Sequence, residues 1–312
     1  MDVTENHKIV PAIFPHIQKT AGTSIVKIAE KHYGNSIITH GEYVGHDPNE
    51  FRDVAFVSGH FGYSFARHFL SERYSFTFLR SPVERVLSFY YYCKRRESNL
   101  FLDYGLSHNP NLNDFLEHSL NNNMLTTAIR NNQVWQLAYG YGHRTKRGYF
   151  DFEEKEMLDL AIKHIEEYSY IGFVETFDED RNIIMTQLGI PIYQTDYETS
   201  EKLDSLPDGI EFKGDLGKLI KYIQESQQLV YKGVMPESTK NVLLDLSKDA
   251  EYRKVINNLF QKSHFVENDS GKRPPAKDLP GHTMELLEEL THYDCLLYDH
   301  AKSLRTTTNI SE

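Results

Sequence analysis

The residues best suited to chemistry lie near the N-terminus, in the run His16-Ile-Gln-Lys-Thr-Ala-Gly-Thr-Ser24. The run offers one positive charge and three hydroxyl donors, from Lys19, Thr20, Thr23 and Ser24. Gly22 lets the backbone approach a ligand closely. Such a loop before a helix presents N–H groups and charge to a phosphate or sulfate. Because the lysine precedes the glycine, the pattern differs from the Walker A motif, whose lysine follows the second glycine.

A second candidate group is His60, which is flanked by Gly59 and Gly62 directly after the apolar run 53–58. An imidazole has a pKa near neutrality, so it can take a proton from a hydroxyl at physiological pH. The chain has 15 histidines, and we expect most of them at the surface. The position of His60 after a strand, between glycines that free the backbone, favours a general base.

A third group is Arg80, which comes directly after the apolar run 74–79. An arginine offers a bidentate fork to a phosphate, and the hydroxyl of Ser88, eight residues later, can complete the binding shell. The residues between them predict a helix start with Ser81 at the N-cap and Glu84 completing a capping box. Taken alone, the pattern also fits a capped amphipathic helix with an ion-paired arginine.

Apolar runs and helical repeats along the chain predict an α/β fold. We expect strands at residues 9–13, 36–39, 53–58, 74–79 and 168–173. We expect helices at residues 25–33, from 82 onward, and at 112–120, 153–167, 174–188 and 283–304. In open α/β sheets ligands bind at the carboxyl ends of strands, and Lys19, His60 and Arg80 all follow predicted strands.

In this order the motifs resemble the sulfotransferases related to heparan sulfate 2-O- and 6-O-sulfotransferases. In that family the loop for the 5′-phosphosulfate reads His-Ile-Pro-Lys-Thr-Ala-Gly-Thr-Ser, so Gln18 is the one departure. The spacing of Arg80 and Ser88 is similar to that of the family's 3′-phosphate motif. Residues 131–137 resemble its Asn-x-Gln-x-x-x-Leu segment near the acceptor, and residues 294–301 resemble its C-terminal helix.

The resemblance implies 3′-phosphoadenylyl sulfate (PAPS) as sulfate donor, 3′-phosphoadenosine 5′-phosphate (PAP) as product, and no metal. It implies His60 as general base and Lys19 as the catalytic cation that neutralises charge on the leaving nucleotide. The implied donor-binding residues are Lys19, Thr20, Ala21, Gly22, Thr23, Ser24, Arg80 and Ser88. A late loop of the family closes over the nucleotide, and Lys272 and Arg273 are either its counterparts or plain surface charges. We expect His16 to be structural beneath the loop rather than a second base.

The family's fold implies a P-loop-like central parallel sheet flanked by helices, with a largely helical C-terminal half. We expect one sulfotransferase domain over residues 1–312. Within it, residues 1–100 would form the PAPS-binding core and residues 101–260 a mostly helical acceptor-side region. Residues 261–312 would supply the donor-closing loop and the C-terminal helix. Residues 192–250 resemble no known segment of the family.

Composition limits the partners. The chain has 312 residues, 39% of them hydrophobic, which is enough for a full core. Its formal net charge of −11 disfavours a polyanionic partner such as nucleic acid or heparan sulfate. We therefore expect a neutral, small or carrier-bound acceptor hydroxyl, on a glycan, a lipid or a secondary metabolite. Val134 and Trp135, which stand where the family often has Thr-Arg, also indicate a less charged acceptor.

The sequence has no apolar run of about 18 residues, the length needed to cross a bilayer, so we expect no membrane insertion. Its two cysteines, Cys93 and Cys295, make no disulfide framework, and we expect both to be buried thiols. These features favour the reducing cytoplasm. The animal relatives carry an N-terminal membrane anchor that this chain lacks, so we expect a soluble, bacterial enzyme.

Two other functions stay open at this stage. A kinase-like phosphotransferase could use the same anion-binding loop, but it would need acidic magnesium ligands at the strand ends. The predicted strand ends offer His60 and Arg80 instead. A non-catalytic nucleotide-binding or scaffold protein could keep the donor site without turnover.

Overall fold

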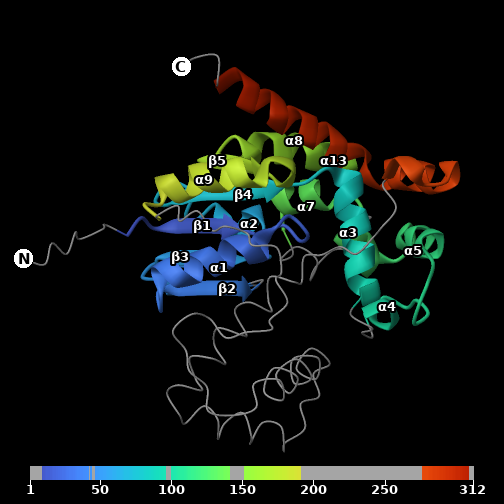
Figure 1. Cartoon of the computed structure of the whole chain (residues 1–312), viewed down its shortest axis with the longest axis horizontal. Helices are drawn as coiled ribbons and strands as arrows, with labels where there is room; N and C mark the ends of the chain where they lie inside the picture. Colours follow the sequence, from blue (N-terminus) through green and yellow to red (C-terminus); the bar gives the residue numbers. More distant parts are fainter. Residues whose placement is uncertain are drawn as a thin grey trace, which may run out of the picture. The chain divides into compact units, whose positions relative to one another are not determined.

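A parallel β-sheet organises the part of the chain that the structure describes (Figure 1). The structure is a computed structural model that describes residues 9–41, 43, 46–95, 100–140, 151–190 and 276–308. Within these ranges the strand order is β2-β3-β1-β4-β5, and every neighbouring pair is parallel. The strands are β1 (Ala12–Pro15), β2 (Ile37–Gly41), β3 (Phe56–Gly59), β4 (Tyr74–Leu79) and β5 (Tyr170–Phe173).

The strands form where apolar residues are covered on both faces of the sheet, as is usual for parallel strands. All four residues of β1 are buried, and successive side chains point to opposite faces. Ala12 and Phe14 pack in one cluster with α1 (Gly22–Tyr33) and α9 (Phe177–Gln187). Ile13 packs on the other face with Phe69 and α2 (Tyr63–Ala66).

The sequence located these strands closely. β4 has the predicted bounds, whereas β1 begins three residues later than predicted, at Ala12. The apolar side chain of Ile9 is 47% exposed, because residues 9–11 lie before the start of β1. A pattern of apolar residues predicts that a strand forms. It does not predict the residue at which pairing with the adjacent strands begins.

Helices make up most of the described chain after β4. They are α3 (Pro82–Arg95), α4 (Leu100–Asp103), α5 (Leu112–Ser119), α6 (Asn123–Ile129), α7 (Asn132–Ala138), α8 (Glu154–Ile165) and α13 (Gly281–Thr308). Short 3-10 helices span Pro48–Phe51, Val174–Thr176 and Ala276–Asp278.

The long helix α13 takes part in two separate hydrophobic clusters between helices. Figure 1 shows it, in red, running along α7 and α8. Its residues Leu297, Tyr298 and Ala301 pack with Trp135 of α7 and other apolar residues of α7 and α8. Its residues Leu286, Leu287 and Leu290 pack with α3, α5 and α6. The N-terminal half of α13 thus packs with α3, α5 and α6, and its C-terminal half packs with α7 and α8. These elements are far apart in the sequence.

These elements confirm the predicted fold class, an α/β fold with a parallel sheet flanked by helices and a helical region after it. Apart from Arg95, the described residues belong to one structural unit, made of residues 1–94, 99–193 and 274–312. The single domain over the whole chain stays a prediction. The segments at 192–250 and 265–275, with Lys272 and Arg273, lie outside the described residues.

Candidate active site

The two anion-binding motifs follow neighbouring strands. The motif of Lys19 follows β1, and Arg80 follows β4, which pairs with β1. After β1 the chain crosses to β2 on one side, and after β4 it proceeds to β5 on the other. In open α/β sheets, this divergence of connections creates the crevice in which ligands bind. The hydroxyl of Thr77 on β4 donates to the carbonyl of Pro15, 2.7 Å away, and so links the two strand ends.

The loop after β1 has the backbone shape of an anion cradle. Lys19 and Ala21 have positive φ angles, 70° and 64°, although neither is a glycine. Such left-handed residues cost free energy and occur mainly where function requires the geometry. Ala21 is the N-cap of α1, and its carbonyl accepts from the N–H of Ser24 at 3.1 Å. Its side chain has no polar atom and caps none of the N–H groups of the first turn. Those groups and the positive end of the helix dipole suit an anion.

The hydroxyl groups of this loop are used unequally. Thr20 is fully buried, and its Oγ1 donates to the carbonyl of Ile17 at 2.8 Å. The Thr20 hydroxyl, which the sequence predicts as a donor to the ligand, therefore stabilises the loop by an internal hydrogen bond. Thr23 is exposed and Ser24 is half-buried, so both hydroxyls lie where a ligand can reach the helix start.

Gly22 is required for packing as well as for ligand approach. A Cβ atom at Gly22 would lie 2.0 Å from Nε2 and Cδ2 of His16. The His16 ring is buried and stacks on Phe14, with 5.6 Å between centroids. The imidazole of His16 thus fills the space that a side chain at 22 would need, which agrees with the structural role predicted for His16.

His60 lies at the end of β3, on the other side of β1 from Arg80. Its Nδ1 is 2.7 Å from the carbonyl of His16. A carbonyl can only accept, so Nδ1 carries the proton, and in the neutral ring Nε2 holds the lone pair. The ring is half-buried and lies 4.6 Å from the His16 ring, centroid to centroid. This arrangement fixes the tautomer that a general base with Nε2 as its acceptor requires.

Arg80 joins the two motifs directly. Its Nη1 donates to the carbonyl of Lys19 at 3.3 Å. The backbone N–H of Arg80 donates to Oε1 of Gln133, and its carbonyl accepts from Nε2 of Gln133, both at 2.9 Å. The ammonium of Lys19 lies 4.0 Å from the centre of the Tyr92 ring, on α3. The guanidinium of Arg80 thus reaches the backbone of the Lys19 loop at the crevice between β1 and β4.

The start of α3 departs from the predicted capping box. The backbone N–H of Ser81 donates to Oε1 of Glu175 at 2.8 Å, where the capping box assigned this N–H to Glu84. Glu175 follows β5, and its Oε2 accepts from the hydroxyl of Tyr298 at 2.7 Å. Ser88 lies two turns into α3 and is half-buried.

A buried carboxyl group supports this region from α13. Asp294 is fully buried and accepts from the N–H groups of Val134 and Gln133, at 2.8 and 3.3 Å. It thus satisfies N–H groups at the start of α7, as an acidic residue at a helix N-terminus does. Burial raises the pKa of Asp294 to about 6, while the Arg85 cation and the backbone hydrogen bonds act in the opposite direction.

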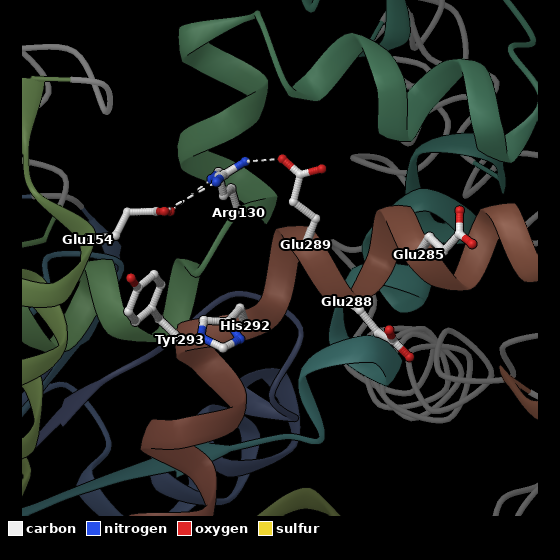
Figure 2. A pocket seen from close by; sticks show the side chains of 7 residues that line it. All are labelled: Arg130, Glu154, Glu285, Glu288, Glu289, His292 and Tyr293. Carbon is white, nitrogen blue, oxygen red and sulfur yellow. Dashed lines mark hydrogen bonds and ion pairs between the residues drawn. The ribbon is translucent and has the colours of Figure 1, made fainter.

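A cleft of about 510 Å³ lies elsewhere, beside α13. It is lined by Arg130, Glu154, Glu285, Glu288, Glu289, His292 and Tyr293. Figure 2 shows the guanidinium of Arg130 between the carboxylates of Glu154 and Glu289, to which it is bonded. None of the predicted site residues within the described part of the chain lines this cleft. Its four carboxylates make it unsuited to a sulfated or phosphorylated ligand.

Comparison with known families decides the class of protein. A profile described as the sulfotransferase family matches residues 1–301. The chain belongs to the sulfotransferase family. A search of curated proteins returns no significant match. Membership of this family assigns to the chain the transfer of a sulfuryl group, with a hydroxyl-bearing acceptor as the general case.

Other features of this sulfotransferase bear on the earlier expectations. Cys93 is buried and Cys295 half-buried, and no disulfide joins them within the described residues. In the same ranges no helix is long and apolar enough to cross a bilayer. No cluster of three or more His, Cys, Asp or Glu side chains in the described part of the chain is placed to hold a metal ion.

The structure thus brings together the predicted residues of the N-terminal loop, His60 and Arg80 at adjacent strand ends. Sequence reasoning missed the two side chains that hold the Arg80 segment. From the sequence, Gln133 is only part of a segment that resembles one near the acceptor, and Glu175 is only part of the helix expected at 174–188. Both stand among other polar residues in the sequence, and their partners are 53 and 94 residues away.

Proposed function

We propose that this sulfotransferase moves a sulfuryl group from PAPS to an acceptor hydroxyl, with His60 as general base. The observation that carries the proposal is the hydrogen bond of Arg80 to the Lys19 carbonyl. It unites a loop suited to a phosphosulfate with an arginine suited to a second phosphate. Two anion sites in one crevice fit a donor with a 5′-phosphosulfate and a 3′-phosphate.

The described residues fit such a donor. The N–H groups at the start of α1, with the hydroxyls of Thr23 and Ser24, would hold the phosphosulfate, and Arg80 with Ser88 the 3′-phosphate. PAPS supplies an activated sulfuryl group when bound there. The ammonium of Lys19 would neutralise negative charge on the leaving nucleotide.

Proton transfer falls to His60. Its Nδ1–H is held by the carbonyl of His16, so Nε2 is the atom that would accept the proton of the acceptor hydroxyl. The carbonyl bond also stabilises the imidazolium that results, because both ring nitrogens are then donors. With His60 taking the proton and Lys19 neutralising the charge, the proposed reaction requires no metal ion.

The acceptor and the compartment stay predictions from composition. The net charge of −11 favours a neutral, small or carrier-bound acceptor, such as a glycan, a lipid or a secondary metabolite. We expect the enzyme in the cytoplasm. Lys272 and Arg273 stay candidates for closing over the donor.

The kinase-like alternative loses support from the strand ends. Glu175 is an acidic residue just after β5, but its oxygens accept from Ser81 N–H and the Tyr298 hydroxyl. Both oxygens of Glu175 are therefore already used, one by the Ser81 backbone and one by the Tyr298 side chain. A non-catalytic nucleotide-binding protein would bind PAP but would not form PAP from PAPS.

The test is PAP formation from PAPS in the presence of a panel of neutral hydroxyl acceptors, measured by chromatography. His60→Asn keeps an amide donor for the His16 carbonyl but has no group that can take the proton. We expect the variant to turn over at least about 100-fold more slowly than the wild type while binding PAP equally well. His118→Gln is a matched control, because His118 also bonds a carbonyl, that of Tyr104 at 2.7 Å, but on α5.

Two results would count against the proposal. Equal turnover by His60→Asn and wild type would remove the role of His60. Tight PAP binding by the wild type without turnover on any acceptor would favour the non-catalytic nucleotide-binding protein.

A further inference from the structure

The backbone of Arg80 and Ser81 is held by side chains from two distant segments. Gln133 on α7 uses both atoms of its amide, accepting from the N–H of Arg80 and donating to its carbonyl, each at 2.9 Å. Glu175 accepts from the N–H of Ser81 at 2.8 Å. Three consecutive backbone polar groups at the corner between β4 and α3 are thus bound by side chains. We call the backbone of Arg80 and Ser81 the Arg80 corner.

The orientation of this corner decides where the guanidinium of Arg80 lies. The side chain is long, so a small rotation of the backbone moves its end over a large distance. In the structure that end donates to the carbonyl of Lys19. Hydrogen bonds that fix the backbone of the corner therefore also fix the position of the cation relative to the N-terminal loop.

Gln133 is itself held rigidly. It is fully buried, and its backbone N–H lies 3.3 Å from the carboxylate of Asp294 on α13. The side chain of Asn131, just before α7, accepts in turn from the backbone N–H groups of Tyr293 and Asp294, at 2.9 and 3.1 Å. These reciprocal bonds join α7 to α13. A side chain with so few alternative positions is suited to positioning another residue.

We propose that Gln133 and Glu175 are positioning residues that hold the Arg80 corner, and that they thereby set the preference for nucleotides with a 3′-phosphate. The inference rests on the proposed donor site. It adds that selection of the donor depends on two side chains that do not themselves contact the nucleotide. An amide is needed at 133, because the corner presents both a donor and an acceptor.

The test compares PAP with AMP, which lacks the 3′-phosphate, by calorimetry on the full chain. Gln133→Met keeps the length of the side chain and removes both hydrogen bonds. We expect the preference for PAP over AMP to fall about tenfold or more, with the affinity for AMP unchanged. Thr291→Val is the matched control, because Thr291 is also fully buried and donates to a carbonyl, that of Leu287 at 2.8 Å. It should keep the preference of the wild type.

A pair of variants at 175 guards against a failure of Gln133→Met to fold, because Glu175 is exposed. Glu175→Met should reduce the preference, whereas Glu175→Gln retains an oxygen acceptor for the N–H of Ser81 and should restore it. General damage to the fold would weaken PAP and AMP binding together and would not follow this order.

The outcomes separate the inference from the function on which it rests. If the wild type does not prefer PAP over AMP, the proposed donor site fails. If the wild type prefers PAP but Gln133→Met and Glu175→Met keep that preference, the donor site stands and the positioning role is overturned.

Discussion

Replacing Gly22 by alanine tests whether the N-terminal loop is packed as described. The added Cβ would lie 2.0 Å from two atoms of the His16 ring and 2.3 Å from a third. Ordinary contact begins near 3.4 Å, so the ring would have to move by about 1.4 Å in a close-packed interior. It has little room, because it is buried between Phe14 and His60.

The magnitude follows from two opposing terms. Overpacking of this kind costs about 1–3 kcal/mol. Alanine in place of a helical glycine recovers roughly 0.5–1 kcal/mol. We therefore expect Gly22→Ala to lower the free energy of unfolding by about 1–2 kcal/mol, measured from the shift of the urea midpoint at constant slope.

Two controls make this prediction specific. Gly281→Ala adds the same methyl group at the start of α13, where no described residue beyond its chain neighbours and its own helix turn has an atom within 4 Å of the new Cβ, and it should not destabilise the protein. In a His16→Ala background the cost of Gly22→Ala should largely vanish, since the two residues are then uncoupled. An equal cost in both backgrounds, or no cost at all, would refute the packing of His16 against Gly22.

Three further predictions concern other interactions. Glu154→Ala should cost about 1–2 kcal/mol of unfolding free energy, because Glu154 binds Arg130 through both oxygens at a mostly buried site; Glu289→Ala, whose side chain is 54% exposed, should cost less than about 0.5 kcal/mol, and equal losses in urea unfolding would contradict this. Burial raises the folded-state pKa of Asp294 from 3.8 to about 6, so its contribution to stability is present below pH 4 and is lost as the pH rises through 6. Unfolding measured between pH 4 and 7 should therefore show wild type losing stability relative to Asp294→Asn by up to about 3 kcal/mol, and a flat difference would contradict the raised pKa. Tyr92→Leu removes the ring that faces Lys19 at 4.0 Å and should slow PAPS turnover about fivefold, consistent with a cation–π contact; Tyr92→Phe should match the wild type, and equal rates for both variants would exclude this role of the ring.

The sequence was informative wherever one local pattern decides one local structure. The apolar run 74–79 predicted β4 to the residue, since both faces of a parallel strand must be covered. The repeat of apolar residues in 283–304 predicted most of α13, which extends over Gly281–Thr308. The motif residues Lys19, His60 and Arg80 were found because their residue types and their places after strands are both local features.

What the sequence could not decide depends on pairing across long separations. The strand order, with β1 between β3 and β4, does not follow from hydrophobic periodicity. A hydroxyl such as that of Thr20 can serve a ligand or its own backbone equally well, and only the fold shows its bond to Ile17. Likewise the bond of His60 to the His16 carbonyl, which fixes the tautomer, requires β1 and β3 to be neighbours.

The central claim, that the crevice between β1 and β4 binds a nucleotide with a 3′-phosphate, is tested most directly by calorimetry with PAP, AMP and ATP. The wild type should bind PAP far more tightly than AMP or ATP. Arg80→Ala should lose about 2 kcal/mol or more of PAP binding, the scale of a hydrogen bond to a charged group, and Arg181→Ala, which removes an arginine paired with Asp178 on α9, should lose none. Equal binding of the three nucleotides by the wild type, or no binding of any, would contradict the account.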